Sequence, residues 1–277
     1  MHAGYWKNHT VSHPYPHTIE TSMSLMFESY NATAYCMVNG QQFRPFILNL
    51  EAFSEVCRDP EEYSGDRFYD NWLYRYYPDS LHELTLKLMK AWDKASFGKS
   101  GYVEHLWEIK EVIAFLSETP IQSPGKPPKP YSAERVEGNL ENTHNRYKTL
   151  QYCVHLCTQI SPELAKISPQ NVVHFNDQIA FPIQSYMDLL GFQGVLHELY
   201  RVKLKYKETS HVNLKNQAKV LLNRANERLE KIVLSTKKIP SDPKWEGWYD
   251  LENRRPNNGF PTFEMLDQIE AMIETQW

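Results

Sequence analysis

The sequence has 277 residues, of which 41% are hydrophobic and 23% are charged, and its formal net charge is −4 at pH 7. These values lie near the averages for globular proteins, so they exclude a disordered tail protein, a collagen-like chain and a small disulfide scaffold. A chain of this length buries about three quarters of its unfolded surface, which suffices for one large core or two smaller ones.

The cellular compartment is predicted from what the sequence lacks. No stretch approaches the roughly 18 consecutive apolar residues that a membrane-spanning helix needs, and the mean hydropathy is −0.59. The first residues lack the basic start and apolar run of a secretory signal. None of the four cysteines forms a C-x-x-C pair or lies at zinc-finger spacing. We therefore predict a soluble, intracellular protein with no membrane contact, no signal peptide and no transmembrane segment.

The N-terminal region begins with residues 1–18, which hold four of the eleven histidines and two prolines without an apolar period. Because proline breaks a helix, we expect an extended His/Pro-rich arm here. Two apolar runs then flank Asn39-Gly40, a pair that supplies the positive φ angles of a type I′ turn. The sequence therefore predicts one small β-hairpin near residues 33–48, with Pro45 at the edge or the end of its second strand.

Helical periods follow the predicted hairpin. Phe68, Trp72 and Tyr76 recur at four-residue spacing, which is typical of a helix with one aromatic face. Together with the hairpin, these helices make up a predicted N-terminal domain, residues 19–117. The helices expected in it are 65–77, about 80–95 and about 102–117.

A proline-rich segment separates this domain from the rest of the chain. Residues 118–131 contain five prolines, so no regular hydrogen-bonded element fits there and we predict a linker. Residues 132–277 are predicted to form a helical C-terminal domain, and the fold class is mainly α, or α+β at most. The elements expected in this domain are one long helix, short turns at Ser161-Pro162 and Ser168-Pro169, helices over about 182–207 and 212–235, and a last helix from Phe263 to Trp277.

Charge is distributed unevenly along the chain. Residues 200–238 contain eleven basic and three acidic side chains, a net charge of +8. The rest of the chain holds the other 19 basic and 31 acidic side chains, a net charge of −12. On the helix that begins near Val212, apolar positions recur on one side and most cations lie on the other. The near-neutral total therefore hides a strongly basic segment.

Two interpretations of the basic segment stay open. Its cations can form a solvated face that pairs with the chain's own acidic residues, or they can bind a polyanion such as nucleic acid. The sequence pI of about 6.3 is lower than that of most nucleic-acid-binding domains. The candidate polyanion-binding residues are Lys203, Lys205, Lys207, Lys215, Lys219, Arg224, Arg228 and Lys231.

Pro78-Asp79 and Glu108-Ile109-Lys110 have the order and spacing of the PD-(D/E)xK motif of metal-dependent nucleases. In that motif two carboxylates hold Mg²⁺, and the lysine orients or activates the attacking water. The motif is short enough to occur by chance, and residues 102–117 show a helical period where it needs a strand. Asp79, Glu108 and Lys110 are the candidate catalytic residues of this alternative.

Two Glu-x-x-His pairs give a second enzyme alternative. Glu141 and His144 form one pair, and Glu208 and His211 form the other. Such pairs on two helices of a bundle hold carboxylate-bridged di-metal centres, with iron or manganese as the metal. Composition alone produces pairs of this kind, so spacing does not establish a site.

We therefore predict a non-catalytic binding or assembly component. Its basic helices, residues 200–238, would contact a polyanion such as nucleic acid, or an acidic protein partner, and self-assembly is also compatible with the sequence. No cofactor is predicted for this function. The alternative is a metal-dependent enzyme, either a PD-(D/E)xK-like nuclease with Mg²⁺ or a helical di-metal carboxylate protein with iron or manganese.

Overall fold

The structure, a computed structural model, describes residues 15–32, 34, 38, 43–96, 102–119, 133–237 and 260–277. Within these ranges the regular elements are helices, and no strand occurs among them. The prediction of a mainly α fold is therefore confirmed. None of the helices in these ranges has both the length and the apolar character that crossing a bilayer requires.

The predicted β-hairpin near residues 33–48 is not supported. Its second strand, from Phe43 to Leu48, instead forms the first turns of α2 (Phe43–Arg58). Pro45 lies in the first turn of that helix, where backbone amides have no intrahelical partner, so a proline is tolerated. Most of the predicted first strand and the Asn-Gly turn fall on residues 33, 35–37 and 39–42, which lie outside the described residues.

The predicted extended arm, residues 1–18, also lies mostly outside the described residues, which begin at Tyr15. Its last residues are helical rather than extended, because α1 (Pro16–Ser24) begins with Pro16. A proline suits this position, since its fixed φ is helical and the amide it lacks would have no partner there. A π-helical turn, η1 (Leu25–Ser29), continues α1.

The other predicted helices occur close to their expected positions. α3 (Gly65–Tyr76) has the predicted aromatic face, with Phe68 and Trp72 buried. The remaining elements are the 3-10 turn η2 (Asp79–Leu81), α4 (His82–Ser96), α5 (Tyr102–Ser117), α7 (Pro169–Phe175), the π-helical turn η3 (Asn176–Ala180), α8 (Phe181–Thr209), α9 (Val212–Lys237) and α10 (Phe263–Gln276).

One helix is longer than predicted. α6 (Ala133–Ile167) continues through Ser161-Pro162, where the sequence predicts a new helical turn, and it contains Pro162 in its interior. A proline there removes one intrahelical hydrogen bond. Ile160 and Leu164, on either side of it, are fully buried, so their packing offsets that loss and the helix continues.

Contacts divide the chain into two compact units. Unit 1 comprises Met1–Tyr102 and Thr149–Tyr186, and unit 2 comprises Val103–Lys148 and Met187–Trp277. α6 therefore begins in unit 2 and ends in unit 1, whereas α8 begins in unit 1 and ends in unit 2. This division does not follow the predicted boundary at residues 118–131, because α5 and the first half of α6 both belong to unit 2. The linker and the two domains that it would separate stay predictions.

Unit 1 is built around α1, α2, α3 and α4. α1 packs against α2 and α3, and α3 packs against α4. Tyr69 and Trp72 on α3 are completely buried. The ring of His17 on α1 contacts the buried carboxylate of Asp93 on α4. Gly65 begins α3 at this point, and a Cβ there would lie 2.6 Å from the His17 ring, so only glycine allows α1 to approach so closely.

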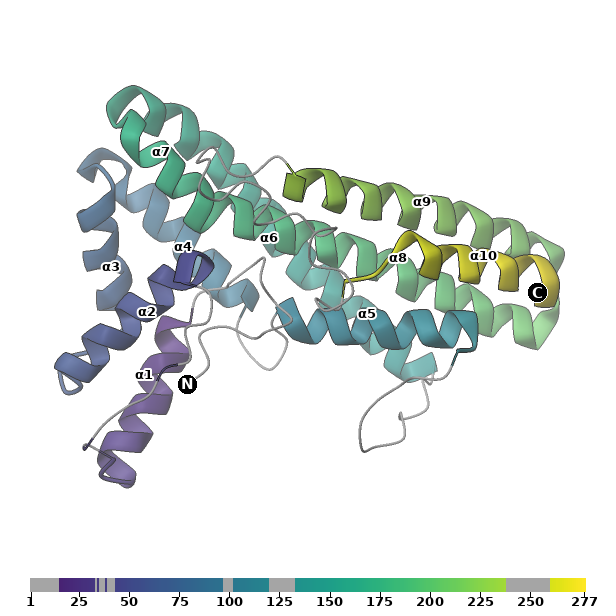
Figure 1. Cartoon of the computed structure of the whole chain (residues 1–277), viewed down its shortest axis with the longest axis horizontal. Helices are drawn as coiled ribbons and strands as arrows, with labels where there is room; N and C mark the ends of the chain where they lie inside the picture. Colours follow the sequence, from purple (N-terminus) through teal and green to yellow (C-terminus); the bar gives the residue numbers. More distant parts are fainter. Residues whose placement is uncertain are drawn as a thin grey trace. The chain divides into compact units, whose positions relative to one another are not determined.

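Unit 2 is a bundle formed by α5, the first half of α6, α8, α9 and α10. α5, α8, α9 and α10 lie lengthwise beside one another in Figure 1. α9 packs against α10, and α10 buries Leu266, Ile269 and Ile273. Residues 200–237 of the basic segment cover the second half of α8, the short junction after it and α9, so this described part belongs to the bundle.

Candidate functional site

The first of the predicted cations, Lys203 on α8, is directed into unit 2. It exposes 2% of its side chain, and its Nζ donates to the carbonyls of Phe115 and Leu116 at 2.9 and 3.0 Å. These carbonyls end α5, where a helix has no amides left to bind them. Burial lowers the pKa of Lys203. Lys203 therefore caps α5 and does not present its charge to a polyanion.

Glu118 forms ion pairs with two of the predicted cations at the end of α5. Its Oε1 lies 2.9 Å from Nζ of Lys203 and 2.9 Å from Nζ of Lys207. Hydrogen bonds from these two lysines lower the pKa of Glu118 to about 2. Lys207 nevertheless exposes 60% of its side chain, so its ammonium group remains accessible from solvent.

Two further predicted cations contact the C-terminal end of α10. Nζ of Lys215 donates to the backbone carbonyls of Glu274 and Trp277 at 3.0 and 3.3 Å. Nζ of Lys219 lies 2.5 Å from Oε1 of Glu274. Lys219 and Lys215 lower the pKa of that carboxylate. The ring of Trp277 also stacks on Tyr206 of α8, at 5.8 Å between centroids.

Three more predicted cations lie on α9 opposite partners within unit 2. Arg224 is 3.6 Å from Glu198, and Lys231 donates to Oδ1 of Asp188 at 2.7 Å. The guanidinium of Arg228 lies 6.0 Å from the centroid of the Tyr147 ring. Arg224 and Lys231 each keep 52% of the side chain exposed, whereas Asp188 is 1% exposed.

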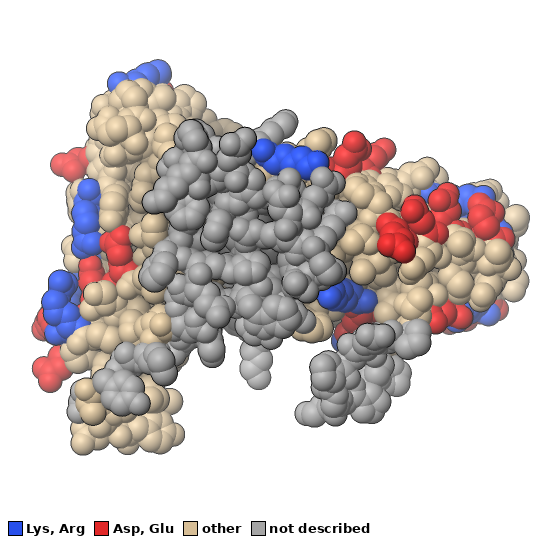
Figure 2. Space-filling model, in the orientation of Figure 1, with Lys and Arg blue, Asp and Glu red and all other residues tan. Residues whose placement is uncertain are grey.

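Lys205 differs from the other predicted cations. It is exposed on α8 and forms no ion pair within the part of the chain that the structure describes. Acidic and basic side chains are interspersed at the right-hand end of Figure 2, where α8, α9 and α10 lie in Figure 1. The surface of the basic segment is therefore a mixture of paired cations and carboxylates, with Lys205 as an additional positive charge.

The three candidate nuclease residues belong to different units. Asp79 lies in η2 of unit 1, whereas Glu108 and Lys110 lie on α5 of unit 2 and therefore on a helix instead of a strand. Nζ of Lys110 lies 5.5 Å from the centroid of the Trp107 ring. Glu108 accepts a hydrogen bond from Gln193 at 2.6 Å, so its contacts are with α8.

The four candidate metal ligands lie at the surface of unit 2. Glu141 and His144 are exposed on α6, and Glu208 and His211 are exposed at the junction of α8 and α9. Nδ1 of His211 accepts from the amide of Asn213 at 3.3 Å. Within the described ranges, no three histidine, cysteine or acidic side chains are placed so that they could share a metal ion.

A buried polar network that the sequence analysis did not identify connects α5 and α8. Nδ1 of His105 and Oε1 of Gln193 are 2.7 Å apart, and the amide nitrogen of Gln193 donates to Glu108. Burial raises the pKa of Glu108. It also lowers the pKa of His197, on the same helix as Gln193, to about 3. The hydrogen bonds of Gln193 with His105 and Glu108 thus link α5 to α8.

Unit 1 contains a second group of this kind, at the end of α3. The hydroxyl of Tyr77 lies 3.0 Å from Nδ1 of His174, and the His174 ring stacks on Tyr76 at 4.6 Å. Burial lowers the pKa of His174 to about 4. His174 is therefore a neutral packing residue that joins α7 to α3.

Comparison of the chain with protein-family models, with curated proteins and with solved structures finds no match.

Proposed function

We propose that the chain is a non-catalytic binding component that contacts an acidic partner, foremost a polyanion such as nucleic acid, through the exposed cations of residues 200–238. The observation that carries this proposal is that Lys205, Lys207 and Arg224 are exposed to solvent. Lys207 exposes 60% of its side chain and Arg224 exposes 52%. Ion pairs between exposed side chains contribute about 0 to 1 kcal/mol. A phosphate can therefore replace Glu118 or Glu198 as the partner of these cations at little cost.

The structure narrows the set of residues on which this proposal depends. Lys203 is buried, and Lys215 exposes 23% of its side chain and donates to two carbonyls. Lys231 is exposed, but it neutralises the buried carboxylate of Asp188. Removing Lys231 would take away an ion-pair partner of a buried carboxylate, which destabilises a protein. Lys205, Lys207 and Arg224 are therefore the positions at which binding can be tested without disturbing the fold.

The test compares two variants with the same change of charge. Lys205→Gln, Lys207→Gln and Arg224→Gln are combined in one chain, and the exposed positions Lys94→Gln, Lys148→Gln and Lys166→Gln are combined in the control. Affinity for single-stranded RNA and duplex DNA is measured by fluorescence anisotropy over a range of salt concentrations. We expect the first variant to weaken binding at least about ten-fold and to flatten the salt dependence, with little change in the control.

Two results would overturn the proposal. One is the absence of binding to RNA, DNA and polyglutamate by the unmodified chain at low salt. The other is an equal loss of affinity in both variants, which would show that overall charge decides binding and not this face. Polyglutamate serves as a second probe, because binding to it but not to nucleic acid would identify an acidic protein as the partner.

A further inference from the structure

Buried apolar side chains on α1 are followed at its end by exposed ones. Ile19 and Met23 are buried in unit 1, with 2% and 5% of their surface exposed. Leu25, Met26 and Tyr30, which follow within one or two turns, expose 51%, 41% and 68%. The lower-left tip of the molecule in Figure 2, where the purple helix ends in Figure 1, is covered mainly by uncharged atoms.

The exposed apolar side chains begin where the helix type changes. η1 continues α1 as a π-helical turn, and a wider turn shifts every following side chain around the helix axis. The turn ends at Ser29, and Asn31, two residues later, has a φ of 49°. The amide of Ala32 donates to the carbonyl of Met26 at 3.0 Å. π-helical turns of this kind are frequent at functional sites.

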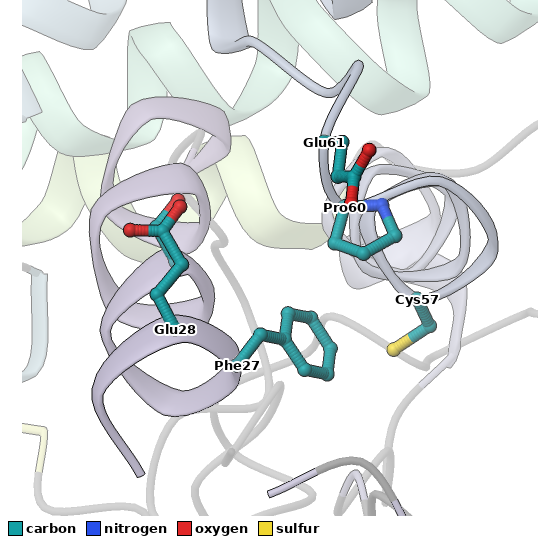
Figure 3. A pocket seen from close by; sticks show the side chains of 6 residues that line it. Phe27, Glu28, Cys57, Pro60 and Glu61 are labelled. Atoms are coloured by element: carbon teal, nitrogen blue, oxygen red, sulfur yellow. The ribbon is translucent and has the colours of Figure 1, made fainter. Parts of the chain in front are cut away.

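Beside this turn lies a pocket of about 430 Å³, between η1 and the end of α2. Figure 3 shows the ring of Phe27 directed across the pocket toward Cys57, with Pro60 on the same side as Cys57. Ser24 completes the lining near α1. A pocket of this volume is within the range of ligand sites and can take one or two large apolar side chains.

Two carboxylates border the pocket. Glu28 and Glu61 belong to its lining, are exposed, and form no ion pair or hydrogen bond within the described part of the chain. Nearby Glu62 differs, because it accepts from Arg67 at 2.7 Å. Arg58 follows Cys57 on α2 but does not belong to this lining. The rim of the pocket therefore has negative charge that no cation of the described chain neutralises.

We propose that this pocket binds a segment of a partner protein that carries a large apolar side chain next to lysine or arginine. The apolar side chain would pack against Phe27 and Pro60, and the cation would lie between Glu28 and Glu61. Leu25 and Met26 would extend the contact along the segment. An apolar anchor surrounded by charged pairs is the usual composition of a small, reversible protein interface. The basic segment of the chain and this acidic pocket would then recognise partners of opposite charge.

The probes are two synthetic helical peptides with the same leucine pattern, one with lysine and one with glutamate at the polar positions. Binding to the full chain is measured by fluorescence anisotropy. Occupation of the pocket is measured by the rate at which iodoacetamide alkylates the exposed thiol of Cys57. Cys153 and Cys157 are buried, and burial raises the pKa of both thiols to about 12, so they react slowly. Peptide mapping separates Cys57 from the other three cysteines.

We expect the leucine–lysine peptide to bind and to slow alkylation of Cys57 at least about five-fold, and the leucine–glutamate peptide to do neither. Combined Glu28→Gln and Glu61→Gln substitutions should weaken binding about ten-fold and remove the protection. The matched control combines Asp79→Asn and Glu83→Gln, two exposed acidic positions elsewhere on unit 1, and should keep both. Met26→Ala should weaken binding of the peptide without changing the far-ultraviolet circular dichroism.

Binding that leaves Cys57 unprotected would overturn the proposal, because the peptide would then occupy another surface. An equal loss of affinity in the control variant would overturn it too, since general charge attraction would explain both. If Cys57 becomes protected at higher protein concentration without any peptide, and light scattering shows a dimer, the occupant is a second copy of the chain and the partner segment is wrong.

Discussion

Glu118 shows how a single residue can determine the role of several charges. It has a positive φ of 54° just after α5, which places its carboxylate between Lys203 and Lys207. Lys203 donates hydrogen bonds to the carbonyls that end α5, and Glu118 forms an ion pair with Lys203. Two residues that the sequence assigns to different features, a linker and a polyanion-binding face, therefore form one local structure.

The first prediction concerns the pH dependence of this group. The pKa of Glu118 is about 2 in the folded chain and 4.5 in its reference state. A lowered folded pKa stabilises the fold above about pH 4.5, and this contribution is lost as the pH falls toward about 2. We expect Glu118→Gln to lower the free energy of unfolding at pH 7 by only about 1 kcal/mol, because solvent screens a side chain that is 43% exposed.

The measurement is urea unfolding of both chains between pH 7 and pH 2. The difference between them should shrink as the pH falls below about 4.5 and vanish near pH 2. Glu137→Gln is the matched control, since it removes a half-exposed carboxylate that lies 3.5 Å from Arg201. A difference between wild type and Glu118→Gln that stays constant over the whole range contradicts the assignment.

Residues such as these could be identified from the sequence as charged, but their partners could not. Lys203 binds carbonyls 87 and 88 positions earlier in the chain, and the distance in sequence between His105 and Gln193 is 88. A helical period indicates which side of a helix is apolar, yet it does not indicate which other helix will lie there. The pairing of the basic segment within the chain was one of two open interpretations for this reason.

α10 illustrates which interaction holds an element in place. Its contact with α9 combines the buried Ile273 with an ion pair between Glu274 and Lys219. Burial of an isoleucine side chain stabilises a fold by about 2 to 5 kcal/mol relative to alanine. An exposed ion pair is screened by water and contributes far less. The apolar contact should therefore dominate.

The second prediction separates these two effects. Ile273→Ala should lower the free energy of unfolding by about 2 to 4 kcal/mol, whereas Glu274→Gln should leave it nearly unchanged. Both free energies of unfolding are measured with urea. Added salt should slightly lower the stability of the wild type and of Ile273→Ala, which keep the ion pair, and should not affect Glu274→Gln in this way. If Glu274→Gln destabilises the chain as much as Ile273→Ala, α10 is held by its charges and our interpretation is wrong.

At the scale of elements, the helices with a strong apolar period were predicted, as was the short α7 that begins with Pro169, whereas α1 and α2 were not. α3, α5, α8, α9 and α10 follow the sequence pattern. α1 and α2 do not: Pro16 counts toward an extended arm and Asn39-Gly40 toward a hairpin whose second strand holds Pro45, although both prolines lie in a first helical turn. Proline excludes a helix only where its missing amide would have had a partner. Pro162 shows that packing can override even that rule.

At the scale of the whole molecule, the path of two helices matters more than the proline-rich segment. α6 and α8 each pass from one unit to the other without interruption. A helix is cooperative, since each added residue depends on the turn before it. Each unit has its own buried core. If one unit unfolds, however, α6 and α8 lose the turns that continue their helices in the other unit.

The third prediction is that the two units unfold as one. Leu88→Ala in α4 and Leu229→Ala in α9 each remove a completely buried side chain, one from each unit. Each should lower the free energy of unfolding by about 2 to 5 kcal/mol. Because α6 and α8 are shared, amide hydrogen exchange should accelerate in the cores of both units in either variant.

The control is Lys94→Ala, at an exposed position on the same helix as Leu88. Acceleration confined to the unit that carries the substitution would show that the units unfold independently, and this prediction would be wrong.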